Sequence, residues 1–137
     1  MSAKIRSVEY FYTTVYDRPG EGCRILNSLA EGGVNLLAFT AVPVGPERTQ
    51  IVLFPDNVDK LVRLAEDSDF VLTGPHRAFL VQGDDRLGAL VEIHRKLCDE
   101  NINVYSSSGV TDGKGGYGYI MHVKPEDYDN AARVLDV

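Results

Sequence analysis

Runs of strand-like and of helical periodicity follow one another along the first half of this chain. Residues rich in β-branched and aromatic side chains form four strand-like runs: 8–16, 34–44, 49–54 and 69–73. Between the first two runs, apolar residues recur at the spacing of one helix face: Ile25, Leu26, Leu29 and Ala30. After Asp56, which we predict to be a helix N-cap, a second such stripe follows: Val58, Leu61, Val62 and Ala65. The pattern predicts the element order β-α-β-β-α-β.

The second half of the chain shows the same succession. Strand-like runs cover residues 77–82, 102–111 and 117–123, with a glycine-rich hairpin turn at 112–116. One helical stripe follows the first of these runs: Leu87, Leu90, Val91, His94, Leu97 and Cys98. Another begins at Pro125, a residue suited to a first helical position, and contains Tyr128, Ala131, Ala132 and Leu135. A counterpart of the 69–73 strand is short or missing in this half.

The two halves are copies of one unit. Asp17, Gly20 and Asn35 reappear as Asp85, Gly88 and Asn103, always 68 positions later (88 − 20 = 68 and 103 − 35 = 68). A fixed internal period indicates a duplicated unit. We therefore predict an α+β fold of tandem ferredoxin-like βαββαβ units with antiparallel sheets, divided into domains 1–74 and 75–137.

A missing last strand in the second unit leaves a sheet edge open. In the split β-α-β topology the fourth strand pairs with the first, so residues 77–82 lack a neighbour. Long bare edges promote aggregation, and we expect a cover. Either a partner chain or residues 3–7 can supply it. Units of about 60 residues are also marginal alone, so the copies are expected to pack together or against another chain.

Charge and hydropathy exclude several classes of partner. The formal net charge is −6, and the lysines and arginines are scattered, which disfavours nucleic-acid and membrane surfaces. There is no long apolar run and no signal-peptide pattern near Met1, so we expect a soluble, cytoplasmic protein.

No residue set typical of catalysis or metal binding stands out. Cys23 and Cys98 are far apart in sequence and are expected to be reduced thiols. His76, His94 and His122 lack ligand-like spacing, so we predict no metal site, no cofactor and no catalytic residues. His94 is more simply read as a hydrogen-bonded core histidine.

The motif residues resemble those of the ACT domain family, here as two ACT domains in tandem. The resemblance lies in the strand-to-helix corners and in the start of the following strand: Val15-Tyr16-Asp17-Arg18-Pro19-Gly20 with Gly33-Val34-Asn35-Leu36, and Asp85-Arg86-Leu87-Gly88 with Asn101-Ile102-Asn103-Val104. It covers nearly the whole chain. The second copy departs from the pattern, because Leu87 replaces the proline and its last strand is short or absent.

The resemblance implies a regulatory module that binds an amino acid at interfaces between paired domains. The ligand-binding positions that it implies are Asp17, Arg18, Pro19, Gly20 and Asn35 in copy one, and Asp85, Arg86, Leu87, Gly88 and Asn103 in copy two. It also implies a homodimer, and it leaves the copy-two site the more doubtful one.

The chemistry of the corners fits such a ligand but also has a structural explanation. Gly20 and Gly88 allow close approach, and free amides at a helix start suit an α-carboxylate, while Asp17 or Asp85 can meet an α-ammonium. The same residues are ordinary turn chemistry, in which aspartate closes an Asx-turn and glycine takes positive φ.

We interpret the chain as a non-catalytic regulatory protein that binds an amino acid or a similar small zwitterion. One alternative is a protein–protein interaction module that docks onto an enzyme of amino-acid metabolism. Another is a small ferredoxin-like dimeric enzyme, which needs a titratable residue with a partner in a pocket, and His94 or His122 is then the candidate.

Overall fold

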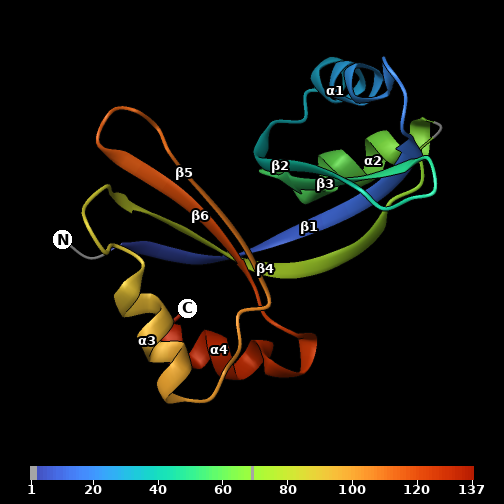
Figure 1. Cartoon of the computed structure of the whole chain (residues 1–137). Helices are drawn as coiled ribbons and strands as arrows, with labels where there is room; N and C mark the ends of the chain where they lie inside the picture. Colours follow the sequence, from blue (N-terminus) through green and yellow to red (C-terminus); the bar gives the residue numbers. More distant parts are fainter. Residues whose placement is uncertain (1–2, 69) are drawn as a thin grey trace. The chain divides into compact units, whose positions relative to one another are not determined.

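The computed structural model describes residues 3–68 and 70–137 and divides the chain into two compact units. We call Glu9–His76 the α1 unit, and Met1–Val8 together with Arg77–Val137 the α3 unit. The elements follow in the order β1 (Lys4–Tyr16), α1 (Glu21–Glu31), β2 (Leu36–Pro43), β3 (Arg48–Pro55), α2 (Val58–Asp67), β4 (Thr73–Asp84), α3 (Val91–Asp99), β5 (Ser106–Thr111), β6 (Gly116–His122), a 3-10 turn (Pro125–Asp127) and α4 (Tyr128–Leu135) (Figure 1).

The α1 unit is a βαββαβ fold whose strand order is β2-β3-β1-β4. β1 and β3 are antiparallel, with Phe11 opposite Leu53, and β2 is antiparallel to β3. Because side chains alternate along a strand, Phe11 and Leu53 face the helices, and Ile25, Leu29 and Leu61 pack against them in one buried cluster. This cluster holds both helices on the sheet.

The α3 unit repeats that arrangement with strand order β1-β4-β6-β5. β4 and β6 are antiparallel, with Phe79 opposite Met121. α3 and α4 lie side by side on this unit (Figure 1), and Leu97 and Ala131 are buried in one cluster with Phe79 and Met121. The Tyr128 ring of α4 stacks on Phe79 with the ring centroids 4.6 Å apart. The predicted α+β fold of tandem βαββαβ units with antiparallel sheets is confirmed.

The N-terminal part of β1 takes the place of the missing fourth strand in the α3 unit. β1 lies next to β4 in the sheet, and a Cβ added at Gly83 would come within 3.1 Å of the Ala3 Cβ. Ile5 packs against the core of this unit, and Ser7 hydrogen-bonds to the Tyr128 hydroxyl. Of the two covers that we considered for residues 77–82, the structure has the chain's own N-terminal segment.

Strand sharing also changes the division of the chain. The predicted strands 69–73 and 77–82 are not separate: β4 is one strand, Thr73–Asp84, while residue 69 lies outside the described residues. β4 contributes its first residues to the α1 unit and the rest to the α3 unit. β1 does the reverse: its residues up to Val8 belong to the α3 unit, and those from Glu9 onward belong to the α1 unit. The units therefore differ from the sequence division at residues 74 and 75.

Two local predictions were wrong. The N-cap of α2 is Asn57, whose side chain accepts the Lys60 amide, and not Asp56. The apolar stripe predicted for α3 is its buried face only in part: Leu97 is buried and Leu90 packs against the core, whereas Leu87 is fully exposed and Val91 half exposed. Ile93, which lies outside that stripe, is buried. Residues 87–90 form a turn before the helix, and this turn changes the side-chain phase along the segment.

Within the part of the chain that the structure describes, no helix is both long and apolar enough to span a membrane.

Strand β1 offers a matched pair of substitutions that tests its role in the α3 unit. Ile5→Asp places a charge against the core, and we expect it to lower the free energy of unfolding by about 2 kcal/mol. Lys4→Asp changes an exposed position of the same strand and should stay within about 0.5 kcal/mol of wild type. Urea titration followed by circular dichroism measures both, and an equal loss for the two variants would contradict this packing.

Candidate functional site

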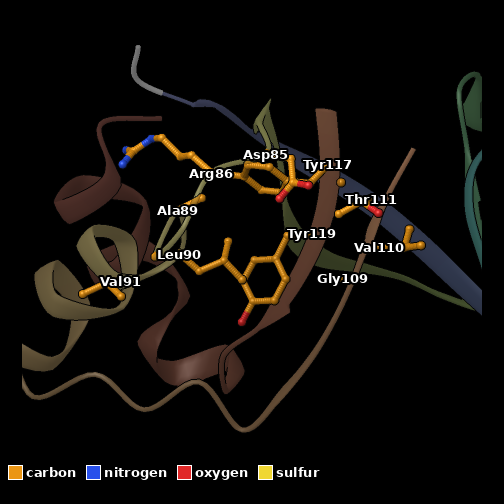
Figure 2. A pocket seen from close by; sticks show the side chains of 12 residues that line it. Asp85, Arg86, Ala89, Leu90, Val91, Gly109, Val110, Thr111, Tyr117 and Tyr119 are labelled. Atoms are coloured by element: carbon orange, nitrogen blue, oxygen red, sulfur yellow. The ribbon is translucent and has the colours of Figure 1, made fainter. Parts of the chain in front are cut away.

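A pocket of about 490 Å³ opens in the α3 unit between the β4–α3 corner and strands β5 and β6. We call it the corner pocket (Figure 2). Its lining residues are Asp85, Arg86, Gly88, Ala89, Leu90, Val91, Gly109, Val110, Thr111, Tyr117, Gly118 and Tyr119. Most of the lining is apolar, and one acidic and one basic side chain lie next to each other in sequence at the corner.

The corner itself is a hydrogen-bonded turn. The Asp85 amide donates to the Gly115 carbonyl at 2.8 Å, which ties the end of β4 to the β5–β6 hairpin. Gly88 has φ +73°, a left-handed conformation that glycine adopts without strain. The amides of Ala89 and Val91 donate to the carbonyls of Arg86 and Gly88 at 3.1 and 3.0 Å. We expected free amides here, and for these two amides that expectation was wrong.

Strands β5 and β6 form the opposite wall of the pocket. Gly109 lies opposite Tyr119 in the ladder, and a Cβ at residue 109 would come within 2.9 Å of the Tyr119 ring. Glycine therefore lets the ring lie close over β5. Leu90 points toward that ring from the corner (Figure 2). The ring and the leucine together make an apolar end of the pocket.

A hydrogen bond between His94 and Tyr119 fixes this wall to helix α3. The His94 Nε2 and the Tyr119 hydroxyl are 2.6 Å apart, and Tyr119 is buried. His94 is thus hydrogen-bonded, as its sequence context suggested. Tyr119 was not among the predicted site residues, because nothing in the strand pattern distinguishes it from a core tyrosine.

The second tyrosine of the pocket is kept neutral. Burial raises the pKa of Tyr117, and the positive charge of Arg86 opposes that shift only in part. At neutral pH Tyr117 therefore presents an uncharged phenol to the pocket.

The glycine-rich turn beside the pocket is a hairpin turn, as predicted. The Asp112 carboxylate accepts the amides of Lys114 and Gly116 at 2.6 and 3.0 Å. These bonds, with that of Lys114 the stronger influence, hold the pKa of Asp112 below its usual range. The turn thereby fixes the end of the hairpin that carries Thr111 and Tyr117.

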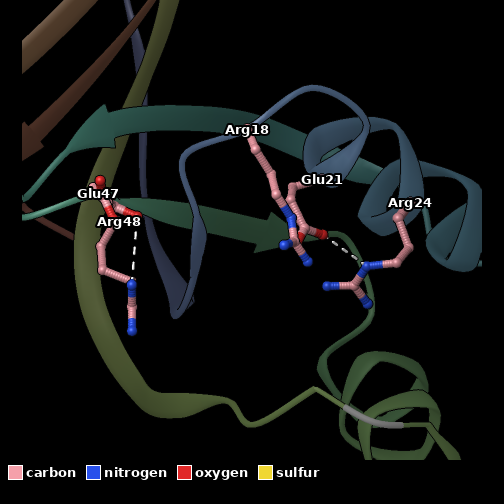
Figure 3. Close-up of polar contacts among 5 residues, drawn as sticks. All are labelled: Arg18, Glu21, Arg24, Glu47 and Arg48. Atoms are coloured by element: carbon pink, nitrogen blue, oxygen red, sulfur yellow. Dashed lines mark hydrogen bonds and ion pairs between the residues drawn. The ribbon is translucent and has the colours of Figure 1, made fainter.

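The corresponding corner of the α1 unit is occupied by the protein's own carboxylate (Figure 3). Glu21, the first residue of α1, has a side chain only 11% exposed and lies between two arginines. Its Oε2 accepts Arg24 Nε at 2.9 Å, and its Oε1 lies 3.2 Å from Arg18. The hydrogen bond from Arg24 and the charges of both arginines lower the pKa of Glu21.

This arrangement has no counterpart in the α3 unit. With the offset of 68, Glu21 corresponds to Ala89 (21 + 68 = 89), Arg18 to Arg86 and Arg24 to Glu92. Glu92 lies 3.9 Å from Lys96 instead. Among the residues that the structure describes, Arg86 has no ion pair. The corner that carries the pocket therefore has an arginine without an internal carboxylate.

The predicted site residues are distributed as follows. Asp85, Arg86 and Gly88 line the corner pocket, but Leu87 points to solvent and does not. Asn103 lines a separate depression of about 350 Å³ that also contains His94 and Asn101.

In the α1 unit, residues Asp17, Pro19, Gly20 and Asn35 are all exposed. The Asn35 carbonyl accepts the Asp56 amide at 2.9 Å, and the Asp17 amide donates to Glu47. Gly20 has φ +93°, so it serves the turn into α1. The hydrogen bond at Asn35 is made by its backbone, so the role predicted for its side chain stays a prediction.

Over residues 3–68 and 70–137 no group of three or more histidine, cysteine, aspartate and glutamate side chains is arranged to hold a metal ion.

The likeness of this chain to known proteins lies in its fold. Neither the protein-family models nor the curated proteins contain a match to the sequence. Among solved structures, a Bacteroides thetaiotaomicron protein matches 96% of this chain and 88% of its own length, with a TM-score of 0.79 and 14% identity.

Two further solved structures are regulatory subunits of aspartate kinase. The Thermus thermophilus subunit, in its ligand-free form, has a TM-score of 0.65 at 13% identity and is matched over 95% of its length. The Thermus flavus subunit has a TM-score of 0.62 at 12% identity, also over 95% of its length. At these identities the likeness establishes the ACT-like fold.

The Glu21 ion pairs predict a pH-dependent contribution to stability. Because the pKa of Glu21 is lowered in the folded state, its contribution is present above the ordinary value of 4.5 and is lost as pH falls through the lowered pKa. Glu21→Gln should therefore melt below wild type at pH 7, and the two melting temperatures should converge as the pH falls below 4.5 and through the lowered pKa. The exposed change Glu66→Gln serves as control and should show no such convergence, and a pH-independent difference for Glu21→Gln would contradict the assignment.

Proposed function

We propose that this protein is a non-catalytic regulatory protein that binds an amino acid or a similar small zwitterion in the corner pocket of the α3 unit. The observation that carries the proposal is the meeting of Asp85, Arg86 and Gly88 at one mouth of a pocket of about 490 Å³. Carboxylate and guanidinium are the natural partners of an α-ammonium and an α-carboxylate. The pocket volume lies in the range of about 300–1,000 Å³ that is usual for small-molecule sites.

The difference between the two corners supports one open site per chain. In the α1 unit the Glu21 carboxylate already satisfies Arg18. In the α3 unit Ala89 leaves that position free, and the exposed Arg86 side chain, which points away from Tyr119 (Figure 2), can turn to an incoming carboxylate. We therefore favour the copy that the sequence made the more doubtful of the two.

The structural neighbours support a regulatory role over a catalytic one. The two Thermus proteins are regulatory subunits of aspartate kinase. The titratable pair that an enzyme would need is His94 and Tyr119, 2.6 Å apart, but His94 does not line the corner pocket. A docking function toward such an enzyme is supported by the exposed Leu87 and Val91 beside the pocket.

Calorimetry and a corner variant test the binding proposal together. We expect heat and a rise in melting temperature with at least one standard amino acid at millimolar concentration. Ala89→Glu should copy the α1 corner by placing a carboxylate near Arg86, and it should weaken binding at least about tenfold.

The control for this variant is Ala30→Glu, the same change at an exposed position of α1, which should leave the affinity unchanged. Equal affinity of Ala89→Glu and wild type would contradict the corner site. If no amino acid produces heat and an enzyme co-purifies with the protein, the result would contradict ligand binding and favour the docking function.

We also propose that the protein is a homodimer. Each unit ends in an edge strand, β2 or β5, and neither strand contains a charged residue. Charges on an edge oppose pairing with another chain, so these edges are open to it. Pairing along β5 would bring a second chain beside Gly109–Thr111 and would border the corner pocket.

Sedimentation equilibrium tests this assembly. Wild type should sediment as a dimer, and Ser107→Lys, at an exposed position of β5, should shift it toward the monomer. Asn27→Lys, on the exposed side of α1, should not. If wild type sediments as a monomer at micromolar concentration, the proposed homodimer is contradicted.

A further inference from the structure

We propose that the corner pocket selects amino acids with an uncharged, apolar side chain. This inference rests on the proposed function, namely binding of an amino acid in this pocket, and adds the chemical class of the ligand. It is carried by what lines the pocket beyond the two charged corner residues.

The charges of the pocket match the charges of an amino-acid backbone and no more. Among the twelve lining residues only Asp85 and Arg86 are charged, and they are adjacent and opposite in sign. If they meet the α-ammonium and the α-carboxylate, no counter-ion remains for an ionised side chain. Such a side chain would lose its hydration without compensation, so lysine, arginine, aspartate and glutamate should be rejected.

The rest of the lining is a surface for an apolar group. Leu90 and Val91 contribute aliphatic side chains, and Tyr117 and Tyr119 contribute rings. The Tyr119 hydroxyl is already bonded to His94. The hydroxyls of Thr111 and Tyr117 are the polar side-chain groups left for a ligand side chain, and both are uncharged, because burial raises the pKa of Tyr117 further above neutral pH.

One glycine of the wall shapes the room for such a group. At Gly109 the Tyr119 ring comes within 2.9 Å of the Cβ position, so the aromatic face lies low over β5. An extended aliphatic side chain can then lie between Leu90 and the ring, with about 0.8 kcal/mol, or about fourfold in affinity, for each methylene buried.

A homologous series of ligands tests the side-chain class on the intact protein. Calorimetry with alanine, 2-aminobutyrate, norvaline and norleucine should show the dissociation constant falling about fourfold per methylene. Lysine is norleucine with a terminal ammonium added, and it should bind at least about tenfold more weakly. Lysine binding as tightly as norleucine would overturn the inference while leaving amino-acid binding intact. If no amino acid of the panel binds, the result instead contradicts the proposed function.

A single substitution should convert the selectivity. Thr111 lines the pocket, is exposed and lies opposite Tyr117 in the ladder, so Thr111→Asp supplies a counter-ion on the same face as that ring without disturbing the core. The ratio of lysine to norleucine affinity should rise at least about tenfold. Thr40→Asp, the same change at an exposed position of the edge strand β2, is the matched control and should leave the ratio unchanged. A folded Thr111→Asp protein, checked by its melting curve, that keeps the wild-type ratio would overturn the inference.

Discussion

The pairing of β1 with β4 is the constraint on which both units depend. A βαββαβ unit needs four strands to cover its helix layer, and the second copy of this chain brings only three of its own. β1 supplies the fourth through its N-terminal residues, and β4 gives its first residues to the α1 unit. The sheet edge at residues 77–82 is thereby paired rather than bare, and β4 is held where the Asp85 corner begins.

The two repeats differ in the residues at the start of their first helix, α1 or α3. A left-handed glycine turns the chain in both, Gly20 at φ +93° and Gly88 at φ +73°. In the α1 unit, Glu21 then neutralises Arg18 and takes part in the helix start. In the α3 unit, Ala89 stands in its place, and an apolar pocket follows. The replacement of Glu21 by Ala89, together with that of Arg24 by Glu92, thus separates a closed structural corner from a corner that faces a cavity.

Much of the fold could be predicted from the sequence, and the reasons are visible in single residues. The repeat offset of 68 carried the pattern of one unit to the other, and the buried pairs Ile25 and Leu29, Ile93 and Leu97 obey it. Turn chemistry located the Asp112 hairpin correctly. The exposed side of α3 was misjudged, because an apolar stripe in sequence does not say at which residue the helix begins, and α3 begins only at Val91.

The site was harder to predict, since it depends on contacts between segments distant in sequence. Asp85, Arg86 and Gly88 were named from the corner motif, but Tyr117, Tyr119 and Gly109 enter only through the β5–β6 register. Asn35 and Asn103 repeat at the same offset as the corner motifs and were therefore predicted to contact the same ligand, yet Asn103 lines a separate depression. The strand order explains one further point: the α3 unit is discontinuous in the gene, because residues 3–8, which serve as its fourth strand, are encoded before the whole α1 unit. Cutting the gene at the duplication boundary would leave the pocket-bearing half without that strand, so a minimal stand-alone binding module of this protein has to be a circular permutant, with residues 3–8 reattached downstream of α4.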